Sequence, residues 1–477
     1  MPETTYLFFD YETFGLNYRR DRPAQFAAVR TDTSFRPVED PVVIYAKPHL
    51  DCLPDPRAVA VTGILPQDCW EKGLPEPVFA AKIHEMLSRP GTVRMGYNSA
   101  GFDDHVSRFL FWRNFLDAYA PEKNEGCGRH DVFKLAVAAY ALRPEGIVWP
   151  KKDSGRPSFR LEELTKANGL SHEHAHDALS DVEATVALAS LIREKAPRLY
   201  EYAMRIAPKK AVVQLVESGK PLAWVDVSFG PEAGYAQLVA PVCPHPANAN
   251  GVVVFNLRHD PAELLSLTPE TLEEAMRSDS TPAMLKTLRI NQLPFLTTAL
   301  HGLHEGHAGT LGVSLEVARE RYEALKTVAP QVAGVLSLGL ADKSQAGLAP
   351  KEERLYEDAF PSFADRNAFA RIRSESPESL ASLAASGREI FEDDGFEELL
   401  FRYRARNFPD SLADAEKARW KEICRSRLLD GAEGAMTLAA YQEAIDAYAE
   451  EAGEDERAQA ICGALYDWGD FVSESLD

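Results

Sequence analysis

Three separate stretches of the chain carry residues whose types and spacing suit metal-dependent hydrolysis. The first is Asp10-Tyr11-Glu12, where two acids stand two residues apart at the end of an apolar run. If that run is a strand, both carboxylates point to the same face of the sheet, and a divalent cation would offset their mutual repulsion. The open alternative is a pair of solvent-facing acids at the end of a strand.

Two later stretches can add to this pair. Asp103 lies between an expected strand and an expected helix, where the helix dipole alone would also favour an acid. His176 lies just before an expected helix, and Asp181 lies in the first turns of that helix. A five-residue step does not stack two side chains on one helix face. His176 must therefore project from the preceding loop if it is to meet Asp181.

Together these stretches predict a site with two metal ions. Four carboxylates (Asp10, Glu12, Asp103 and Asp181) can hold two Mg²⁺ ions about 3.5–4 Å apart, with Mn²⁺ as an alternative ion. One ion would lower the pKa of an attacking water, and the other would stabilise a leaving 3′-oxygen. His176, with an ordinary pKa of about 6.5, can accept the proton of that water. His172 and His174 are interpreted as surface residues.

The elements that must position these residues follow an alternating pattern over residues 1–196. Apolar runs between turn residues predict strands at Tyr6–Thr13, Gln25–Arg30, Val42–Lys47 and Thr92–Tyr97. Amphipathic spacing predicts helices at Glu76–Leu87, Phe102–Phe115, Asp131–Leu142 and Ser158–Asn168. Asp177 is a suitable N-cap for a further helix that reaches roughly Lys195.

The pattern changes twice after this region. Between residues 197 and 350, β-like runs alternate with turn residues and some helical pieces, which predicts a small β-barrel-type domain; the runs are Val212–Val216, Leu222–Val227 and Gly251–Leu257. From residue 351 the chain is expected to be helical, at Leu355–Phe360, Glu397–Arg406, Leu412–Leu429, Thr437–Ala452 and Glu456–Ser473. Gly339–Lys351 is the expected linker.

Size and composition restrict the class of protein. The chain has 477 residues, which suggests about three domains. Its formal net charge of −21 speaks against nucleic acid when taken alone, because phosphate binding needs Lys and Arg. A nuclease must therefore carry local basic patches on an acidic body. We see no signal peptide and no membrane span, and the six cysteines form no C-x-x-C pair, which favours a reducing cytoplasm.

The residues also resemble a known family. In type and order, Asp10-x-Glu12, Asp103 and His176-x4-Asp181 resemble the DEDD exonuclease superfamily in its histidine variant. Longer stretches are similar to the bacterial exodeoxyribonuclease I family, namely DYETFG, DRPAQFAAVRTD, GYNSAGFDDHVSR, YALRPEGIVWP, SFRLEELTKANG, AHDALSDVEAT and RYRARNFP. The resemblance implies an α/β RNase H-like exonuclease domain at 1–196, with a mixed sheet flanked by helices. It further implies an SH3-like β-barrel-type domain at 197–350 and a C-terminal all-α domain at 351–477.

The resemblance implies a function as well. A member of this family would be a 3′→5′ exodeoxyribonuclease that is specific for single-stranded DNA and releases 5′-mononucleotides, in DNA repair and recombination. Asp10, Glu12, Asp103 and Asp181 would bind the metal ions, and His176 would be the general base. The three domains of a monomer would enclose the DNA. The acidic C-terminal tail of single-stranded DNA-binding protein would recruit the enzyme.

Further residues would contact the DNA by this resemblance: Glu12, Thr13, Arg108, Tyr119, Arg143, Phe159, Arg160, Lys209 and Asn250. The arginines can bind phosphates with two hydrogen bonds. The aromatic rings can stack on bases. The alternative is that Phe159 belongs to the core and that Arg143 caps a helix C-terminus.

Some stretches depart from the family or allow more than one interpretation. Pro121–Gly128 is less aromatic and less basic than in the family, while Val137 and Gln292 stand where a basic residue is expected. We therefore expect a weaker grip on DNA at physiological salt. Arg402-x-Arg404-x-Arg406 could be a DNA-facing rim, a docking site for an acidic peptide, or a solvated helix end.

Two other classes of function stay open. One is a DNA-binding module with the same fold and no catalysis, although such a binder would not need clustered acids near phosphate. The other is an RNA-trimming enzyme of the same superfamily. Two additional domains that could enclose a strand favour long DNA, but stacking on single strands does not by itself detect the 2′-hydroxyl.

Overall fold

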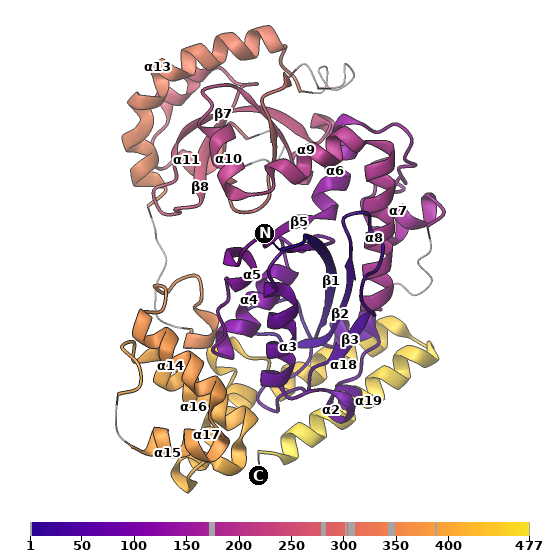
Figure 1. Ribbon diagram of the computed structural model, residues 1–477, viewed down its shortest axis with the longest axis vertical. Coiled ribbons are helices and arrows are strands. Elements are labelled where there is room, and N and C mark those ends of the chain that lie inside the picture. Colours follow the sequence, from indigo (N-terminus) through magenta and orange to yellow (C-terminus); the bar gives the residue numbers. More distant parts are fainter. Residues whose placement is uncertain are drawn as a thin grey trace.

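The computed structural model describes residues 2–170, 177–277, 283–300, 303, 311–341, 349–386 and 389–476. Figure 1 shows three parts: an N-terminal part (residues 2–195) in the centre, a middle part (197–341) on one side of it, and a C-terminal part (349–476) on the other. No helix of the described residues is both long and apolar enough to cross a membrane.

The N-terminal part is a mixed sheet flanked by helices. Its strands are β1 (Thr5–Thr13), β2 (Pro23–Thr31), β3 (Val42–Tyr45), β4 (Thr92–Gly96) and β5 (Gly128–Asp131), in the order β3-β2-β1-β4-β5. β1, β2 and β3 are antiparallel neighbours, whereas β4 and β5 continue the sheet in parallel. Its helices are α1 (Pro56–Thr62), α2 (Pro66–Lys72), α3 (Glu76–Ser88), α4 (Asp103–Arg113), α5 (Ala120–Lys123), α6 (Val132–Leu142), α7 (Leu161–Ala167) and α8 (Ala178–Lys195).

Alternation along β1 assigns its two faces. Tyr6 and Phe8 pack into the core that contains residues of α6 and α8, whereas Leu7 and Phe9 pack into the core that contains residues of α3 and α4. Because successive side chains point to opposite faces, Asp10 and Glu12 continue the face that α8 covers. The apolar half of the strand therefore fixes the direction in which its two acids point.

Two boundary predictions in this part can be compared with the structure. The helix expected at Ser158–Asn168 begins only at Leu161, because Arg160 is the extended N-cap residue. It ends as predicted before Gly169, whose φ of +67° suits a glycine at the end of a helix. The prediction for α8 is confirmed: the Asp177 side chain accepts a hydrogen bond from the backbone N–H of Ser180, and the helix ends at Lys195.

The middle part contains an antiparallel sheet. The strands are β6 (Leu222–Val225), β7 (Ala236–Pro244), β8 (Gly251–Asn256), β9 (Leu285–Arg289) and β10 (Phe295–Thr297), in the order β10-β6-β7-β8-β9. Its helices are α9 (Pro197–Ile206), α10 (Lys209–Val216), α11 (Leu272–Met276) and α13 (Leu315–Gly339), with 3₁₀ turns at Val227–Phe229, Pro231–Ala233 and Pro261–Ser266. The strand predicted at Val212–Val216 is wrong, since these residues belong to α10 and place an apolar stripe against the sheet.

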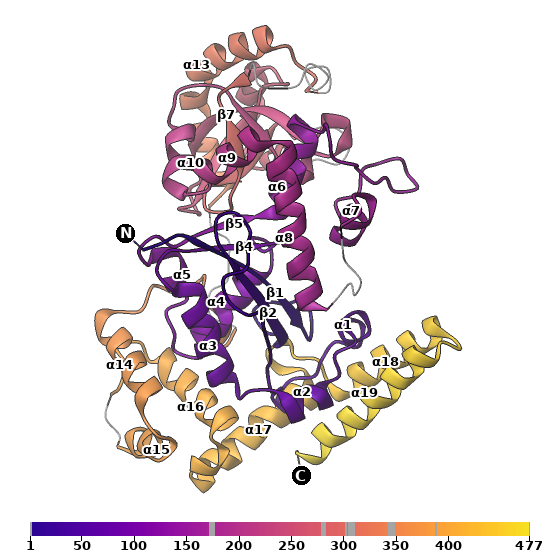
Figure 2. The ribbon, with the colours of Figure 1, turned by 45° about the vertical axis from the view of Figure 1, so that its right-hand side comes forward.

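The C-terminal part is helical. It contains α14 (Phe363–Ser374), α15 (Pro377–Ala385), α16 (Gly395–Asn407), α17 (Asp414–Asp430), α18 (Leu438–Ala452) and α19 (Glu456–Glu474), with 3₁₀ turns at Lys351–Glu353, Pro409–Ser411 and Ala432–Gly434. The helix predicted at Leu355–Phe360 is wrong: α14 begins after it, where Ser362 forms a capping box with Asp365. In Figure 2, α18 and α19 lie side by side next to α1 and α2, and contacts join these two helix pairs.

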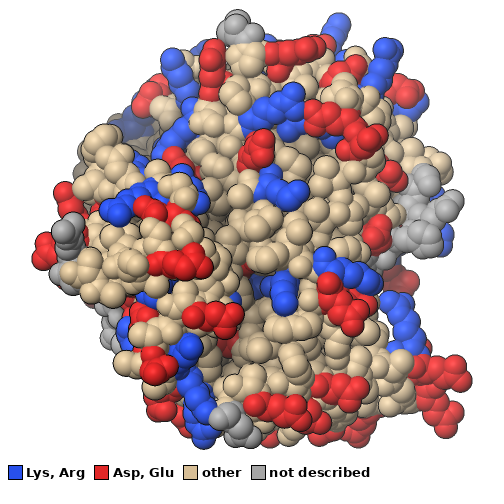
Figure 3. Space-filling model, turned by 60° about the horizontal axis from the view of Figure 1, so that its bottom comes forward, with Lys and Arg blue, Asp and Glu red and all other residues tan. Residues whose placement is uncertain are grey.

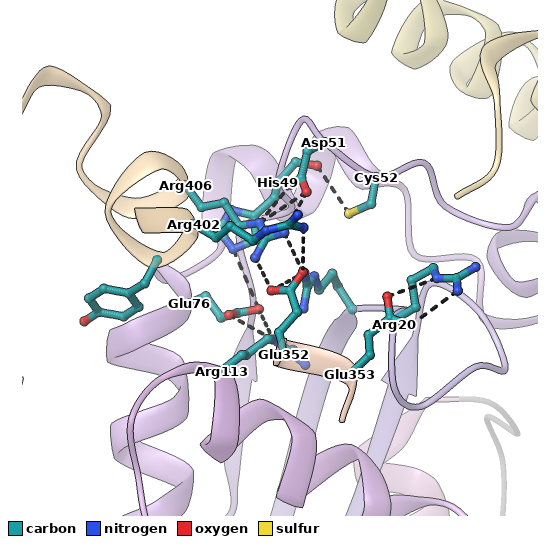
Figure 4. A network of polar contacts seen from close by, with 12 residues as sticks. Arg20, His49, Asp51, Cys52, Glu76, Arg113, Glu352, Glu353, Arg402 and Arg406 are labelled. Atoms are coloured by element: carbon teal, nitrogen blue, oxygen red, sulfur yellow. Dashed lines mark hydrogen bonds and ion pairs between the residues drawn. The ribbon is translucent and has the colours of Figure 1, made fainter. Parts of the chain in front are cut away.

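Arg402, Arg404 and Arg406 are not surface residues, so all three interpretations of this cluster are wrong. Arg402 is 5% exposed and Arg404 is 1% exposed. Arg402 pairs with Glu398 and Glu433, Arg404 with Glu416, and Arg406 with Asp51 and Glu352. Figure 4 shows Arg402 and Arg406 directed at acids from distant segments. Arg406 joins the C-terminal part to the N-terminal part through Asp51, whereas Arg402 and Arg404 pair within the C-terminal part. The cluster offers no free cation to DNA or to a peptide.

The three parts confirm the predicted fold class. An α/β part with a mixed sheet is followed by a part built on a small antiparallel sheet and then by a helical part. The expected linker Gly339–Lys351 falls partly outside the described residues: α13 ends at Gly339, and residues 342–348 are not described.

Candidate active site

Three of the predicted metal ligands meet where β1 passes the N-terminus of α8. Asp10 and Glu12 come from β1 and Asp181 comes from α8, and one ligand oxygen of each lies within 4.8 Å of the other two. Asp181 is separated from Asp10 by most of the N-terminal part of the chain, so only the fold brings these acids together. The spacing that predicted a shared face for Asp10 and Glu12 is consistent with this arrangement.

Gln25 connects the sheet to the start of α8. It is the β2 partner of Glu12 in the antiparallel register. Its side-chain carbonyl accepts a hydrogen bond from the backbone N–H of Ala178 at 3.4 Å, and its amide donates to the hydroxyl of Tyr45 at 2.9 Å. Gln25 therefore positions the helix that carries Asp181. Sequence reasoning missed it, because a single glutamine within an apolar strand gives no signal of its role.

Asp103 approaches the same acids from α4. It is the first residue of that helix, it is 4% exposed, and its carboxylate accepts a hydrogen bond from the backbone N–H of Tyr11 at 3.2 Å. It lies outside the group of three defined by 4.8 Å, but its charge acts on both Asp10 and Glu12. Asp103 thus lies near the group and is held directly by the β1 backbone.

Asp131 holds the loop that precedes Asp103. Its carboxylate accepts hydrogen bonds from the backbone N–H groups of Asn98 and Ala100, at 3.0 and 3.1 Å. It also caps α6 by accepting from the N–H of Phe133 at 3.0 Å. Sequence reasoning placed Asp131 at the start of a helix but missed its second role, for which the N-cap position was the available signal.

Adjacent acids in α4 have opposite electrostatic environments. Asp104 pairs with Arg94 at 2.9 Å and also with Arg129; these cations overcome burial and hold the pKa of Asp104 well below its ordinary value. Burial instead raises the pKa of Asp103 to about 7, with smaller contributions from the charges of Asp104 and Asp131. Asp104 is therefore a structural ion-pair partner, whereas Asp103 keeps an uncompensated carboxylate for chemistry.

Asp10 and Glu12, like Asp103, have among the described residues no cation that compensates for their burial in the way that Arg94 and Arg129 do for Asp104. Burial raises the pKa of Asp10 well above its ordinary value, and the charges of Asp103, Glu12 and Asp181 raise it further. Burial and the charge of Asp181 raise the pKa of Glu12 to about 8. Crowded carboxylates of this kind fit a divalent cation, because it would replace the missing positive charge. An all-oxygen ligand set suits Mg²⁺ or Mn²⁺.

His176, the predicted general base, lies outside the described residues, as do His172 and His174. The described chain resumes at Asp177, which is the N-cap of α8. Of the five predicted catalytic residues, the structure therefore describes the four acids.

The predicted DNA contacts of the N-terminal part differ in accessibility. Thr13 is buried and donates its hydroxyl hydrogen to the carbonyl of Gly15 at 2.7 Å. Arg108 is 7% exposed and pairs with Glu122, and its guanidinium carbon lies 5.5 Å from the centre of the half-buried Tyr119 ring. Arg108, which belongs to the same helix as Asp103, thus lies next to Tyr119, the residue before α5.

The contacts predicted further along the chain fall into three groups. Arg143 is exposed and is the C-cap residue of α6, while Arg160 is exposed and lies 3.8 Å from Glu162. Lys209 donates a hydrogen bond to the side chain of Asn250 at 2.6 Å, so the structure joins these two residues. Phe159 is 7% exposed, and its ring contacts are with Phe133, Tyr140, Trp149 and Tyr235.

The structure also shows the surroundings of the positions at which the sequence departs from the family. Val137 is 2% exposed in α6, so a residue there faces the core. The carbonyl of Gln292 accepts a hydrogen bond from Lys134, which holds the turn before β10. Within Pro121–Gly128, Glu122 pairs with Arg94 and Arg108. Lys and Arg are scattered among Asp and Glu on the face shown in Figure 3.

Comparisons with known proteins identify the class and then the family. Three family models match consecutive stretches: Exonuclease at residues 7–189, Exonuclease I SH3-like domain at 208–337, and Exonuclease I C-terminal domain at 350–472. With the acids clustered on an RNase H-like sheet, these matches define an exonuclease, which is a nuclease hydrolase. Exodeoxyribonuclease I of Escherichia coli (strain K12) is 38% identical over 478 residues, which cover 98% of each chain. The chain belongs to the exodeoxyribonuclease I family.

Further relatives agree with this assignment. Exodeoxyribonuclease I of Haemophilus influenzae is 37% identical over 482 residues, which cover 98% of this chain and 99% of the relative. The crystal structure of E. coli Exonuclease I with a dA16 oligonucleotide has a TM-score of 0.89 at 38% identity and covers 98% of this chain and 100% of that chain. The zinc ion bound form of the E. coli ExoI–ssDNA complex has a TM-score of 0.90 at 37% identity, and the ExoI/SSB-Ct complex has 0.89 at 38%; each covers 99% of this chain and 100% of that chain.

Proposed function

We propose that this protein is a single-strand-specific 3′→5′ exodeoxyribonuclease that releases 5′-mononucleotides by two-metal-ion hydrolysis, in DNA repair and recombination. The observation that carries the proposal is the meeting of Asp10, Glu12 and Asp181 within 4.8 Å, on a chain of the exodeoxyribonuclease I family. The structure of a relative with a dA16 oligonucleotide supports single-stranded DNA as the substrate.

In this proposal the four acids hold two Mg²⁺ ions, with Mn²⁺ as an alternative. When bound, the ions lower the pKa of the attacking water and stabilise the charge on the leaving 3′-oxygen. Asp103 and Asp10 present carboxylates that burial keeps poorly hydrated, so their preference for a cation is strong. His176 accepts the proton of the attacking water as the general base. The zinc ion bound form of a relative supports binding of a divalent ion.

We also propose DNA contacts for Glu12, Thr13, Arg108, Tyr119, Arg143, Phe159, Arg160, Lys209 and Asn250. Glu122 fixes the guanidinium of Arg108, so this residue loses little conformational entropy on binding a phosphate. The hydrogen bond from Lys209 to Asn250 places a cation and an amide together in the middle part. Phe159 can stack on a base only if one of its aromatic neighbours moves, because its ring is almost fully covered.

Partners and organisation belong to the same proposal. The ExoI/SSB-Ct complex of a relative supports recruitment of this protein by the acidic C-terminal tail of single-stranded DNA-binding protein. We place the exonuclease domain at 1–196, the SH3-like domain at 197–350 and the helical domain at 351–477, in a monomer that acts in the cytoplasm. The three family models match within these boundaries, except that the C-terminal model begins at residue 350.

Digestion of end-labelled oligonucleotides tests the proposed function. We expect 3′-labelled single-stranded DNA to release labelled mononucleotide at once, and 5′-labelled DNA to shorten progressively, only with Mg²⁺ or Mn²⁺ present. Duplex DNA and RNA of the same sequence should be cut far more slowly. Equal cutting of the RNA would favour RNA trimming, and binding of DNA without cleavage would favour a non-catalytic module; either result contradicts the proposal.

A further inference from the structure

A cavity of about 550 Å³ lies between the N-terminal and C-terminal parts. Its walls come from the segment after β3, from α2, from the end of α16 with the turn that follows it, and from α17. None of the four catalytic acids and none of the proposed DNA contacts is among its described lining residues. Small-molecule sites in proteins have volumes of roughly 300–1,000 Å³. The two parts therefore enclose a space large enough for a small molecule, outside the active site.

Helix α17 presents cations and an aromatic ring to this cavity. Lys417, Trp420, Lys421 and Cys424 of this helix line it. Counted from Lys417, the other three stand three, four and seven residues further along the chain, a spacing that places all four on one helix face. Lys417 is exposed, the Trp420 ring is half-buried and Cys424 is buried. This face of α17 therefore runs from solvent into the junction between the two parts.

The N-terminal part adds a second indole ring and a cation that lies against it. The ammonium of Lys47 lies 4.1 Å from the centre of the Trp70 ring. Trp70 is itself held by edge-to-face contacts with Trp468 and Phe471, at centroid distances of 5.9 and 5.3 Å. Among the described residues, no ring contact joins Trp70 to Trp420, although both line the cavity. Each of the two parts therefore contributes its own indole ring to the lining.

The acids of the lining are mostly neutralised by arginines. In the described lining these acids are Asp51, Glu76 and Asp410. Asp51 pairs with Arg406 at 2.9 Å, and Glu76 pairs with Arg113 at 3.0 Å. Asp410 is exposed, so water and salt screen its charge. The carboxylates therefore contribute little negative charge to the cavity.

The lysines of the lining are in excess of the acids that remain. Lys47, Lys417 and Lys421 all line the cavity. No described acid forms an ion pair with Lys47 or Lys417, and the indole N–H groups of Trp70 and Trp420 donate no hydrogen bond to a described residue. A ligand with an anionic group and a planar ring would satisfy such a lining, because lysine binds phosphate and an indole face binds a base.

We propose that this cavity binds a nucleoside 5′-monophosphate, with the phosphate at Lys47 and Lys417 and the base against Trp420. The inference rests on the proposed function, which releases such nucleotides as products. A mononucleotide carries one anionic group and one planar ring, and the lining supplies lysines for the first and indoles for the second. Because the bound nucleotide would contact both parts, its binding would stabilise the attachment of the C-terminal part to the N-terminal part.

Isothermal titration calorimetry of the full-length protein with deoxyadenosine 5′-monophosphate (dAMP) tests the site. A chelator is present, so that metal-dependent binding at the active site does not contribute. We expect dAMP to bind with one site per chain, and deoxyadenosine and inorganic phosphate to bind far more weakly, because each lacks one of the two groups. Trp420→Leu should raise the Kd of dAMP roughly 5- to 150-fold, the range of base–aromatic stacking. Lys47→Ala should raise it roughly 10- to 100-fold, the range of hydrogen bonds to charged groups.

Three further variants serve as controls. Lys72→Ala removes the same charge from α2, two residues after Trp70, but Lys72 pairs with Asp68 and is not among the residues that line the cavity. It should bind dAMP as the wild type does. Trp420→Phe keeps an aromatic face and should retain most of the affinity. Asp181→Ala should leave the affinity unchanged, because Asp181 belongs to the active site and not to this cavity.

Several results would overturn the proposal. They are an absence of dAMP binding, equal affinities for dAMP and inorganic phosphate, and binding that Asp181→Ala removes but Lys47→Ala and Trp420→Leu leave intact. Binding of a short acidic peptide without binding of dAMP would assign the cavity to protein docking and would also overturn it. Cleavage of end-labelled DNA is measured separately, and Lys47→Ala should cleave at the wild-type rate. A wild-type protein that binds dAMP at this cavity but cleaves no DNA would contradict the proposed function and leave the nucleotide site supported.

Discussion

Arg406 of α16 and Asp51, which are 355 residues apart in the chain, form an ion pair through three hydrogen bonds. The Arg406 Nε–Asp51 Oδ1 distance is 3.1 Å and the Nη2–Oδ2 distance is 2.9 Å. Both side chains are almost fully buried, and the same guanidinium also binds Glu352 (Figure 4). The attachment of the C-terminal part to the N-terminal part therefore depends on a network of buried charges, in which Asp51 also pairs with Arg427.

Arg406→Ala should destabilise the protein strongly. The substitution leaves the buried carboxylates of Asp51 and Glu352 with fewer cations, and loss of one partner of a buried pair costs about 3–5 kcal/mol. The free energy of unfolding from urea denaturation measures the effect. Arg57→Ala is the matched control: Arg57 pairs with Glu451 across the same two parts, but both side chains are more than half exposed. It should change stability by less than about 1 kcal/mol, and equal effects of the two variants would refute this account.

Stability should fall in acid because of the same carboxylates. Burial alone would raise the pKa of Asp51, but Arg406 and Arg427 overcome it and hold this pKa well below the ordinary value. A depressed folded pKa contributes stability above the unfolded pKa of about 4, and this contribution is lost as the pH falls below that value. Asp51→Asn should therefore be less stable than the wild type at pH 7, and the difference in Tm should narrow below about pH 4. A difference that stays constant with pH would speak against this linkage.

Asp181→Ala should abolish cleavage and leave DNA binding largely intact. The carboxylate belongs to the three-acid group and not to a phosphate clamp. Glu183→Ala is the control, because Glu183 is exposed on the same helix two residues later. Turnover of end-labelled DNA and affinity by fluorescence anisotropy are measured for both variants. Normal turnover of Asp181→Ala would remove this acid from the site.

His176→Ala should slow cleavage roughly 10²- to 10⁴-fold, because a general base usually contributes a rate increase of this size. His174→Ala, a change of the same type two residues earlier, should leave the rate unchanged. Single-turnover rates with saturating Mg²⁺ separate the chemical step from product release. If His176→Ala kept the wild-type rate, another group would have to accept the proton.

The sequence was informative where local rules determine the structure. Alternation along Tyr6–Glu12 predicted that the two acids share a face, and Asp177 marked the beginning of α8. These features depend on neighbouring residues, which any single sequence contains. The family resemblance added the order of the parts, which periodicity alone left as a coarse α/β, β and α pattern.

The sequence was uninformative where a residue's partner lies far along the chain. Arg406 looked like a surface cation because Asp51 and Glu352 cannot be recognised as its partners without the fold. Val212–Val216 favoured a strand by its β-branched residues, although packing against a sheet makes it a helix. Gln25 gave no signal because its role needs the register of β1 with β2.

Binding of Mn²⁺ tests the central claim most directly, since that claim is that acids from distant segments share divalent ions. Electron paramagnetic resonance can count bound Mn²⁺ in the wild-type protein and in Asp10→Asn and Asp181→Asn, with Glu183→Gln as the control for nonspecific binding to surface acids. We predict two tightly bound ions per chain in the wild type and in Glu183→Gln, with loss of tight binding in the other two variants. Equal Mn²⁺ binding in all four proteins would contradict the account.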